Sequence, residues 1–442
     1  MIPSTKAVGI YTLGCKVNQY ESEAIAELFE TAGFAVRRPT DVCDVYLINT
    51  CTVTAESDRK ARNFIRRATR RNPNAVILVT GCYSQVAPSD VAAIPGVDYV
   101  CGNANKSAVV AAAKRLLDEK KKPIAPEVVC TPPDQFGFEP MSITKFDRTR
   151  AYVKIEDGCE NRCAYCIIPS ARGSVRSKSP DDVIAEVTAL TQNGCREVVL
   201  TGIETASYGK DLPGVTLADL LERVDAIPGI GRVRLGSLDP SLMKPQFVER
   251  IAALNSLAPH FHLSMQSGSD GVLARMRRKY NTRMAFDGIA RLREAIPGVQ
   301  ITTDMITGFP GETDAEFEET LAFVERAAFL SIHVFPYSRR VGTVADAMPD
   351  QIPEPIKAER AAALTSLQQG IRKKILDRQL GREADVLFET YKNGIAFGHT
   401  ADFIEVAVPS PVALHAQIHR IRIEENDGAQ CRGHILSDEK GE

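Results

Sequence analysis

Short β-branched runs alternate with amphipathic helical stretches along most of the chain. In its first part, strands are expected at residues 7–13, 45–50 and 75–80, and a helical pattern at 21–33 separates the first two. Such alternation is typical of βαβ units around a parallel sheet. The sequence therefore predicts an α/β domain over residues 1–121.

A second alternating region follows a proline-rich stretch. Residues 122–148 lack periodicity and are predicted to be a linker. Between residues 149 and 377, each strand-like run is followed by a helical pattern, and the runs are "AYVKI", "EVVLT", "RVRLGS", "FHLSM", "ITTDMI" and "SIHVFPY". These repeats are too few for a closed eight-fold barrel, so we expect a partial (βα)6 barrel with functional residues at the carboxyl ends of its strands.

The last segment, residues 378–442, has a different pattern. Alternating polar and apolar runs are separated by turn residues, which predicts a small all-β barrel or sandwich. The segment is acidic, with seven Lys and Arg against eleven Asp and Glu. It would therefore bind nucleic acid only through a local face, or else pack mainly against the preceding barrel. Four histidines are candidates for such a face: His399, His415, His419 and His434.

Composition indicates an ordinary soluble protein of several domains. The chain has 442 residues, 44% of them hydrophobic, and a net charge of −2, so any surface for nucleic acid must be local. The N-terminus lacks the pattern of a signal peptide, and no apolar run reaches the ~18–20 residues of a membrane span. Eleven cysteines fit poorly with a closed disulfide framework. We expect a cytoplasmic protein with no membrane partner, in which clustered cysteines bind metal.

The first cysteine cluster directly follows the first expected barrel strand. Cys159, Cys163 and Cys166 form a CxxxCxxC motif in "GCENRCAYC". Composition alone gives this spacing in less than about one such chain in a hundred. A structural zinc would need a fourth ligand, and no histidine is near in sequence. An iron–sulfur cubane held by three thiolates leaves one iron open to a substrate or cofactor.

A second set of cysteines lies in the N-terminal domain. Cys15, Cys51 and Cys82 each come just after an expected parallel strand. The carboxyl ends of such strands share one edge of the sheet, so the three thiols can meet there and hold a second open cubane. Ordinary burial of cysteine is the alternative. The remaining cysteines have no partners at informative spacing and are interpreted as structural: Cys43, Cys101, Cys130, Cys195 and Cys431.

These motifs resemble those of a known family. CxxxCxxC after the first strand of a partial barrel looks like the radical S-adenosylmethionine superfamily. Two open-site clusters in a flavodoxin-like domain and a radical barrel, followed by a tail similar to a TRAM domain, resemble the methylthiotransferases over essentially the whole chain. The motifs that carry the resemblance are "TLGCKVNQYESE", "NTCTVT", "GCYSQ", "GCENRCAYCIIPSARG", "HLSMQSGSD" and "GFPGET".

The resemblance implies an activity and its cofactors. Two stretches, "TLGCKVNQYES" and "IEDGCENRCAYCIIPSARG", look most like the MtaB branch, which adds a methylthio group to C2 of N6-threonylcarbamoyladenosine at position 37 of tRNA. It implies two [4Fe–4S] clusters and S-adenosylmethionine, which would chelate the open iron of the Cys159, Cys163 and Cys166 cluster. The auxiliary cluster, on Cys15, Cys51 and Cys82, would carry the transferred sulfur. Implied partners are tRNA and an electron donor such as a flavodoxin-type reductant.

Other residues are weaker candidates for the cofactor pocket. Gln266 and Ser267 are polar residues at a strand end, although Ser267 could instead cap a helix. Gly308 and Gly311 could let the backbone approach S-adenosylmethionine, although glycine is also a plain loop residue. In "TGIETASYG", Glu204 stands where Asn or His is expected in relatives, so its polar contact is open.

A basic helix is the candidate RNA surface. In residues 56–71, Arg59, Arg62, Arg66 and Arg70 project opposite an apolar stripe of Ala61, Phe64, Ile65 and Ala68. A solvated helix face is the alternative, but the helix begins just after Cys51, which would put phosphate-binding cations beside the auxiliary cluster. Three other functions stay open: methylthiolation of isopentenyl-adenosine in tRNA, methylthiolation of a ribosomal-protein aspartate, and an RNA-binding protein with two electron-transfer clusters or zinc.

Overall fold

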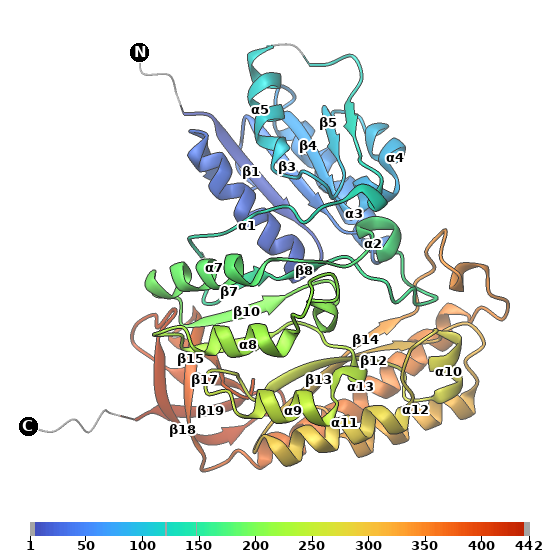
Figure 1. Ribbon diagram of the computed structural model, residues 1–442, viewed down its shortest axis with the longest axis vertical. Helices are drawn as coiled ribbons and strands as arrows, with labels where there is room; N and C mark the ends of the chain where they lie inside the picture. Colours follow the sequence, from blue (N-terminus) through green and yellow to red (C-terminus); the bar gives the residue numbers. More distant parts are fainter. Residues whose placement is uncertain (1–4, 120–121, 147, 437–442) are drawn as a thin grey trace, which may run out of the picture.

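The N-terminal part of the computed structural model is built on one parallel sheet (Figure 1). The structure describes residues 5–119, 122–146 and 148–436. The sheet has six strands in the order β2-β1-β3-β4-β5-β6. In chain order they are β1 (Ala7–Thr12), β2 (Ala35–Arg37), β3 (Val45–Thr50), β4 (Val76–Gly81), β5 (Tyr99–Cys101) and β6 (Glu127–Val129). The helices of this part are α1 (Lys16–Thr31), α2 (Ala55–Arg71), α3 (Cys82–Val86), α4 (Pro88–Ala92) and α5 (Ala108–Asp118).

Both faces of this sheet are covered. Val45 and Leu47 of β3 pack in one apolar cluster with α1 and α5, whereas the alternate residues Tyr46 and Ile48 pack in another with α2 and α4. A parallel strand buried on both faces reads as a continuous apolar run, which is why β3 was predictable at its observed bounds. This doubly wound arrangement agrees with the predicted flavodoxin-like domain.

Part of the predicted linker belongs to this sheet. β6 adds a sixth strand in parallel with β5 at the sheet edge, and all three of its residues are exposed. The 3-10 helix η1 (Pro133–Gln135) follows, and the chain then runs between the sheet and the barrel (Figure 1). The Tyr20 hydroxyl of α1 donates to the carbonyl of Met141 at 2.6 Å, so this segment joins the two parts.

The central part is a partial parallel barrel, as predicted. Two three-stranded sheets, in the orders β11-β10-β7 and β12-β13-β14, are joined by isolated parallel bridges such as Leu238 with Leu263. The strands are β7 (Ala151–Lys154), β10 (Glu197–Thr201), β11 (Arg232–Leu235), β12 (His260–Gln266), β13 (Gln300–Thr307) and β14 (Ser331–Pro336), with a short antiparallel pair β8 (Glu156–Asp157) and β9 (Arg176–Ser177).

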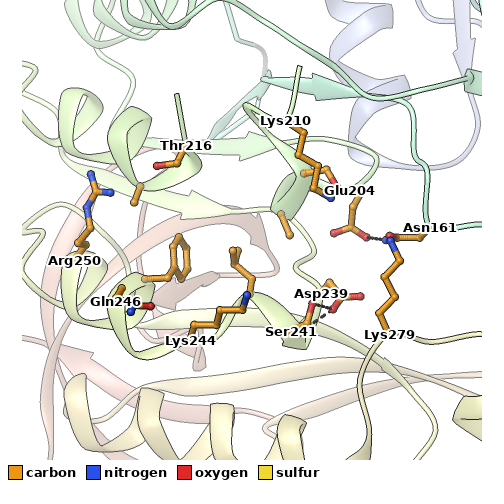
Figure 2. Close-up of a pocket in the computed structure, with 15 residues that line it drawn as sticks. Asn161, Glu204, Lys210, Thr216, Asp239, Ser241, Lys244, Gln246, Arg250 and Lys279 are labelled. Carbon is orange, nitrogen blue, oxygen red and sulfur yellow. Dashed lines mark hydrogen bonds between the residues drawn. The ribbon is translucent and has the colours of Figure 1, made fainter. Parts of the chain in front are cut away.

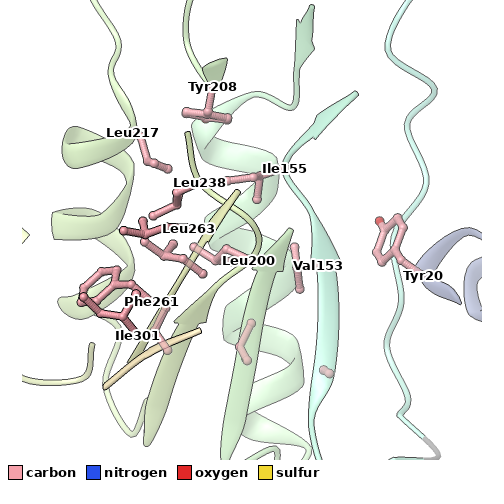
Figure 3. Close-up of a cluster of buried hydrophobic side chains, with 14 of the residues drawn as sticks. Tyr20, Val153, Ile155, Leu200, Tyr208, Leu217, Leu238, Phe261, Leu263 and Ile301 are labelled. Carbon is pink, nitrogen blue, oxygen red and sulfur yellow. The ribbon is translucent and has the colours of Figure 1, made fainter. Parts of the chain in front are cut away.

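Helices cover the outside of this barrel. The hydrophobic cluster in Figure 3 contains Val153 and Leu200 from two strands, together with Phe261 and Leu263 of β12, all fully buried. The helices are α6 (Ile168–Arg172), α7 (Pro180–Gln192), α8 (Leu217–Asp225), α9 (Pro245–Ala252), α10 (Asp270–Arg275), α11 (Thr282–Ala295), α12 (Asp314–Ala327) and α13 (Glu354–Asp377), with 3-10 helices η2 (Thr205–Ser207), η3 (Pro240–Leu242) and η4 (Ala345–Ala347).

The last segment closes into a small β-barrel, which confirms the predicted all-β, TRAM-like domain. Its strands are β15 (Glu383–Lys392), β16 (Ile395–Thr400), β17 (Glu405–Pro409), β18 (Ile418–Asn426) and β19 (Cys431–Ile435). It lies beside the central barrel (Figure 1). Phe403 inserts between His260 of β12 and His399, with ring centroids 4.3 and 4.6 Å away. Across the described residues, no helix is both long and apolar enough to cross a bilayer.

Candidate metal centres and substrate site

Three cysteines stand at the carboxyl ends of three neighbouring strands in the N-terminal sheet. Cys15 follows β1 and precedes α1, Cys51 directly follows β3, and Cys82 directly follows β4 and opens α3. A β-carbon added to Gly14 would lie 2.9 Å from the Cys51 sulfur, so the turn before Cys15 touches Cys51. The structure brings together the three thiols that the strand pattern placed at one edge.

The surroundings of Cys15 and Cys51 favour the protonated thiol. Burial, together with the neighbouring Cys82 thiol, raises the pKa of Cys51 to about 12. Burial also raises the pKa of Cys15, although the Arg172 guanidinium lowers it. Cys15 is nevertheless solvent-accessible, although many protein groups surround its sulfur. Since metal ligands are thiolates, metal binding here would release protons.

The second set lies in the loop after β8, at the carboxyl side of the barrel. Gly158 precedes Cys159 at φ +89°, and a β-carbon there would lie 1.9 Å from a backbone carbonyl oxygen, so only glycine fits this turn. Burial raises the pKa of Cys159 and of Cys166 to about 12 each. Cys163 differs, because Arg278 Nη1 donates to its sulfur at 3.1 Å. This hydrogen bond fixes the position of the Cys163 side chain against the barrel.

Each set offers three thiols, the donor type of an iron–sulfur cluster. Within the described residues, no group of three or more His, Cys, Asp or Glu side chains is close enough to hold one metal ion. The cysteines of a [4Fe–4S] cluster each bind a different iron, so their sulfurs stand farther apart than the ligands of one ion. Thiols are also the ligand type that such clusters use. The residues therefore fit two clusters, each with three thiolate ligands from this chain.

The side-chain amide of Asn103 connects the region of the first thiol set with that of the second. Asn103 Nδ2 donates to the carbonyl of Ala171 at 2.8 Å and approaches the Cys82 sulfur at 3.6 Å. Ala171 belongs to α6, which begins two residues after Cys166. The two thiol sets therefore face a common interface between the N-terminal sheet and the barrel.

Buried charges hold this interface together. Glu21 of α1, with a side chain 1% exposed, accepts hydrogen bonds from Lys106, Lys154 and Arg172. Arg172 Nη1 also donates to Asp157 at 2.9 Å. Although burial alone would raise it, the three cations hold the pKa of Glu21 well below its usual range. Helix α1, which starts at the first thiol set, is thus fixed to α6, which follows the second.

A cavity of about 390 Å³ opens beside the second thiol set (Figure 2). Asn161 Nδ2 donates to Glu204 Oε2 at 3.1 Å, whereas the buried Oε1 has no hydrogen-bond partner among the described residues. Burial, together with Asp239, raises the pKa of Glu204 to about 7, so this carboxyl group is half protonated near neutrality. The cationic lining residues are Lys210, Lys244, Lys279 and Arg250.

The two polar candidates at the end of β12 differ in whether their side chains are free to bind a ligand. Gln266 is partly exposed, has φ +65°, and its side-chain amide makes no hydrogen bond within the described residues. Ser267 is 1% exposed and accepts a hydrogen bond from the backbone N–H of Ser269 at 3.2 Å. Ser269 stands at the N-cap of α10. Gln266 is therefore free for a ligand, while Ser267 is engaged locally.

The two candidate glycines have local structural roles. Gly308 has φ +70°, and a β-carbon there would lie 2.3 Å from Lys357 Cγ on α13. Gly311 has φ +72° with more space around it, since the nearest atom lies 3.6 Å away. Close packing explains glycine at the first position, and the left-handed backbone explains it at the second.

The predicted basic helix is α2, and its apolar stripe is buried as expected. Arg59 is paired with Glu56, and Arg62 is partly buried, with its Nη1 3.1 Å from the Tyr83 hydroxyl. Arg66 and Arg70 are exposed and form no ion pair with the rest of the described chain. The open part of this surface is therefore the C-terminal half of the helix.

Three residues at the site were missed in the sequence. Asn161 lies inside the cysteine motif, where its position alone could have suggested it. Asn103 comes just after β5, so the strand-end argument would have found it if applied to a fourth strand. Arg278 lies in a basic run, "MRRKYNTR". Nothing in the neighbouring sequence distinguishes it from a surface arginine, although in the structure it contacts the Cys163 sulfur.

Two family models match the chain. The model of the Radical SAM superfamily matches residues 153–324, and that of the Uncharacterized protein family UPF0004 matches residues 7–102. A threonylcarbamoyladenosine tRNA methylthiotransferase MtaB of Bacillus subtilis (strain 168) is 40% identical over 423 residues, covering 94% of this chain and 93% of the relative. The chain belongs to the radical S-adenosylmethionine methylthiotransferase family.

Other members of the methylthiotransferase family are nearly as similar. The MtaB protein of Thermotoga maritima is 39% identical over 90% of this chain and 91% of the relative. A tRNA-2-methylthio-N(6)-dimethylallyladenosine synthase of Moorella thermoacetica is 37% identical over 88% of both chains. Family membership implies S-adenosylmethionine and [4Fe–4S] clusters as cofactors.

Solved structures support the fold. A radical S-adenosylmethionine methyltransferase, TsrM from Kitasatospora setae with cobalamin and a [4Fe-4S] cluster bound, matches with a TM-score of 0.57 at 15% identity, covering 77% of each chain. At this identity the match concerns the arrangement of helices and strands.

Proposed function

We propose that this protein adds a methylthio group to C2 of N6-threonylcarbamoyladenosine at position 37 of tRNA. The observation that carries the proposal is the pair of thiol sets, each with three cysteines, facing one interface in a chain that is 40% identical to an MtaB methylthiotransferase. Three thiolates leave one iron of a cubane open, whereas clusters that only carry electrons are usually ligated by four cysteines.

In this proposal the two thiol sets hold different clusters. Cys15, Cys51 and Cys82 are the ligands of the auxiliary [4Fe–4S] cluster. The radical cluster is bound by a separate set, Cys159, Cys163 and Cys166. When bound, the clusters and S-adenosylmethionine supply one-electron chemistry and the sulfur and methyl groups.

The residues around the second set orient and stabilise it. Arg278 orients Cys163 by donating a hydrogen bond to its sulfur. Glu204, whose Oε2 accepts a hydrogen bond from Asn161, lines the cavity next to that set. Gln266 has a free amide for the S-adenosylmethionine site, in which Ser267, Gly308 and Gly311 would contribute packing and backbone shape.

The tRNA would approach over α2. Arg66 and Arg70 are exposed cations, with Arg59 and Arg62 beside them on the same helix. A second, smaller cavity of about 180 Å³ lies on this helix and includes Arg67, next to the ring of Tyr11. A groove that combines cations with an aromatic ring suits both phosphate and base.

The domain assignment follows the same plan. Residues 1–121 would be the auxiliary-cluster domain, 149–377 the radical core and 378–442 the TRAM-like domain, while 122–148 connects the first two and also contributes β6 to the first sheet. The reaction would take place in the cytoplasm, where tRNA and a flavodoxin-type electron donor are present.

The test is nucleoside mass spectrometry of tRNA after anaerobic reaction with the reconstituted full chain, S-adenosylmethionine and reductant. Equal amounts of threonylcarbamoyladenosine and isopentenyl-adenosine are supplied in tRNA. A methylthio group on the first nucleoside is the expected product. Its appearance only on the second would favour the activity named for the Moorella relative, and no product on either would overturn the proposal.

Cysteine variants separate the two clusters. Cys159→Ala should abolish cleavage of S-adenosylmethionine, whereas Cys51→Ala should spare cleavage, lose about half of the bound iron and stop methylthiolation. Cys43→Ala is the matched control, because Cys43 is equally buried but lies near the other end of β3. Full turnover by Cys51→Ala would refute the assignment of two clusters.

A further inference from the structure

The inner face of strands β12 to β14 is polar. On β12 and β13, Phe261, Leu263, Ile301 and Met305 are fully buried, whereas the alternating residues carry His262 and Asp304, and His333 follows on β14. Successive side chains of a strand point to opposite faces, so these polar groups face the inside of the barrel. The His333 side chain is 62% exposed and that of Asp304 is 25% exposed, so this face is open to solvent.

Both carboxylate oxygens of Asp304 are already occupied. His262 Nε2 lies 3.2 Å from Oδ2, and His333 Nδ1 lies 3.2 Å from Oδ1. Asp304 raises the pKa of His333, which favours its protonated form. The polar face therefore offers imidazole groups rather than a free carboxylate.

Lys16 extends toward this face from the first thiol set. It is the residue after Cys15 and the first residue of α1, and its side chain is only partly exposed. Its charge acts on Asp304, His333 and Arg234, which belong to three different strands. Among the described residues, its ammonium makes no hydrogen bond and no ion pair. Burial lowers the pKa of Lys16 and the nearby Asp304 raises it, so this side chain has one carboxylate in its surroundings but is bonded to no group of the described chain.

A second donor in the same region is also unsatisfied. Arg234 is 3% exposed, its Nε donates to Glu197 at 2.7 Å, and its Nη1 is buried without a partner within the described part of the chain. Arg150 and Arg232 also pair with the Glu197 carboxylate, and Arg150 has a second partner in Glu389, so two carboxylates serve three guanidinium groups. Buried donors without partners are rare in proteins and call for a ligand or water. Here the missing partner is an acceptor.

The substrate that the proposed function assigns carries such an acceptor. The N6 group of threonylcarbamoyladenosine ends in a carboxylate and a hydroxyl, whereas an isopentenyl group is wholly apolar. A face of imidazoles with an unpaired ammonium next to it suits the former and would leave polar groups unpaired against the latter.

We infer that Lys16 is a specificity residue that binds the carboxylate of the threonylcarbamoyl group while Cys15 beside it serves the auxiliary cluster. This inference rests on the proposed function. It explains how one helix start positions both the sulfur source and the end of the substrate farthest from C2. The imidazole of His333, whose Nδ1 is paired with Asp304, has its second ring nitrogen as a further donor to the same group.

The test compares two synthetic anticodon stem-loops, one with threonylcarbamoyladenosine and one with its carboxylate methyl ester. Binding to the reconstituted full chain is measured by fluorescence anisotropy without S-adenosylmethionine, and turnover is measured separately. A hydrogen bond to a charged group contributes about 1.5–3 kcal/mol, so the wild type should bind the acid roughly ten- to a hundredfold more tightly than the ester. Lys16→Gln should bind both alike, at the affinity of the ester.

Two further variants complete the test. Lys16→Arg should keep much of the preference for the acid, and Lys6→Gln should keep all of it, because Lys6 precedes β1 at the opposite edge of the sheet, paired with Asp44. Because acid and ester are compared on the same preparation, reduced cluster loading cancels from the ratio. A full preference in Lys16→Gln would overturn the inference. No turnover of the acid stem-loop by the wild type, with turnover of an isopentenyl-adenosine stem-loop, would instead overturn the proposed function.

Discussion

Glu21→Gln is expected to destabilise the junction between the N-terminal sheet and the barrel. In the structure, the Glu21 carboxylate accepts hydrogen bonds from Arg172, Lys154 and Lys106, all nearly inaccessible to solvent. A glutamine has the same shape, but its NH₂ group would face one of these cations donor to donor. The change also leaves Asp157 as the remaining charged partner of Lys154 and Arg172, and leaves Lys106 with only the side-chain oxygen of Asn49.

The magnitude follows from the burial of the network. Removing one partner from a buried ion pair costs about 3–5 kcal/mol, since the other charge stays buried and uncompensated. Glu30→Gln, on the same helix, is the matched control: Glu30 and its partner Lys145 have side chains 44% and 71% exposed. Exposed pairs of this kind contribute about 0–1 kcal/mol.

The measurement is thermal unfolding of the metal-free protein, followed by circular dichroism under reducing conditions. At about 2–4 °C per kcal/mol for units of this size, Glu21→Gln should lower the Tm by roughly 6–20 °C, and Glu30→Gln by a few degrees at most. The pKa of Glu21 is depressed in the folded state, so its contribution is present above the unfolded pKa of about 4.3 and is lost as the pH falls through the folded value. Equal shifts for the two variants at pH 7 would refute the reasoning.

Three further changes test other contacts. Asp304 raises the pKa of His333, so this pair stabilises the fold below about pH 6.5 and loses its effect as the pH rises through the folded-state pKa. In Asp304→Asn, NMR titration should find the pKa of His333 close to 6.5. An unchanged pKa would exclude the ion pair. Phe403→Ala removes a ring that lies between two histidines and should cost roughly 2–4 kcal/mol of stability. The C-terminal barrel should then be released faster by proteolysis. An unchanged rate of proteolysis would mean that other contacts hold this barrel in place. Arg340→Ala leaves the buried carboxylate of Asp58 without its cation and should lower the Tm by several degrees; an unchanged Tm would mean that the pair does not stabilise the fold.

Periodicity was enough to predict the fold wherever a strand or helix is buried on a regular face. β3 lies at its predicted bounds because all six of its residues are buried. The apolar stripe of α2 was readable because every third or fourth residue packs on the sheet. β6 had no such signal: its three residues are exposed, prolines flank it, and only pairing with β5 makes it a strand.

The candidate site likewise contains contacts that the sequence predicts and contacts that it does not. The meeting of Cys15, Cys51 and Cys82 was predictable because topology puts the ends of adjacent parallel strands at one edge. The contacts of Glu21 and Arg172 were not, because a charged residue in a helix reads as a surface residue until the partner element is docked. The basic run at Ser338–Arg340 shows the same limit: it looks like an RNA patch, but Arg340 binds Asp58 and Thr52, beside Cys51.

The nature of the junction has a consequence for how the two thiol sets are spaced. An apolar interface of the same area would tolerate sliding and repacking, since hydrophobic contact has no preferred direction. Charged hydrogen bonds do have one: Arg172 meets Asn18 Oδ1 at 2.6 Å and Glu21 Oε1 at 2.9 Å, and a small displacement would break several bonds at once. Buried charges contribute less to the stability of this interface than apolar side chains of the same size would, but they make its geometry specific. Since α1 starts beside Cys15 and α6 follows Cys166, that geometry fixes the separation across which a sulfur donor and a radical source would have to act on one adenine.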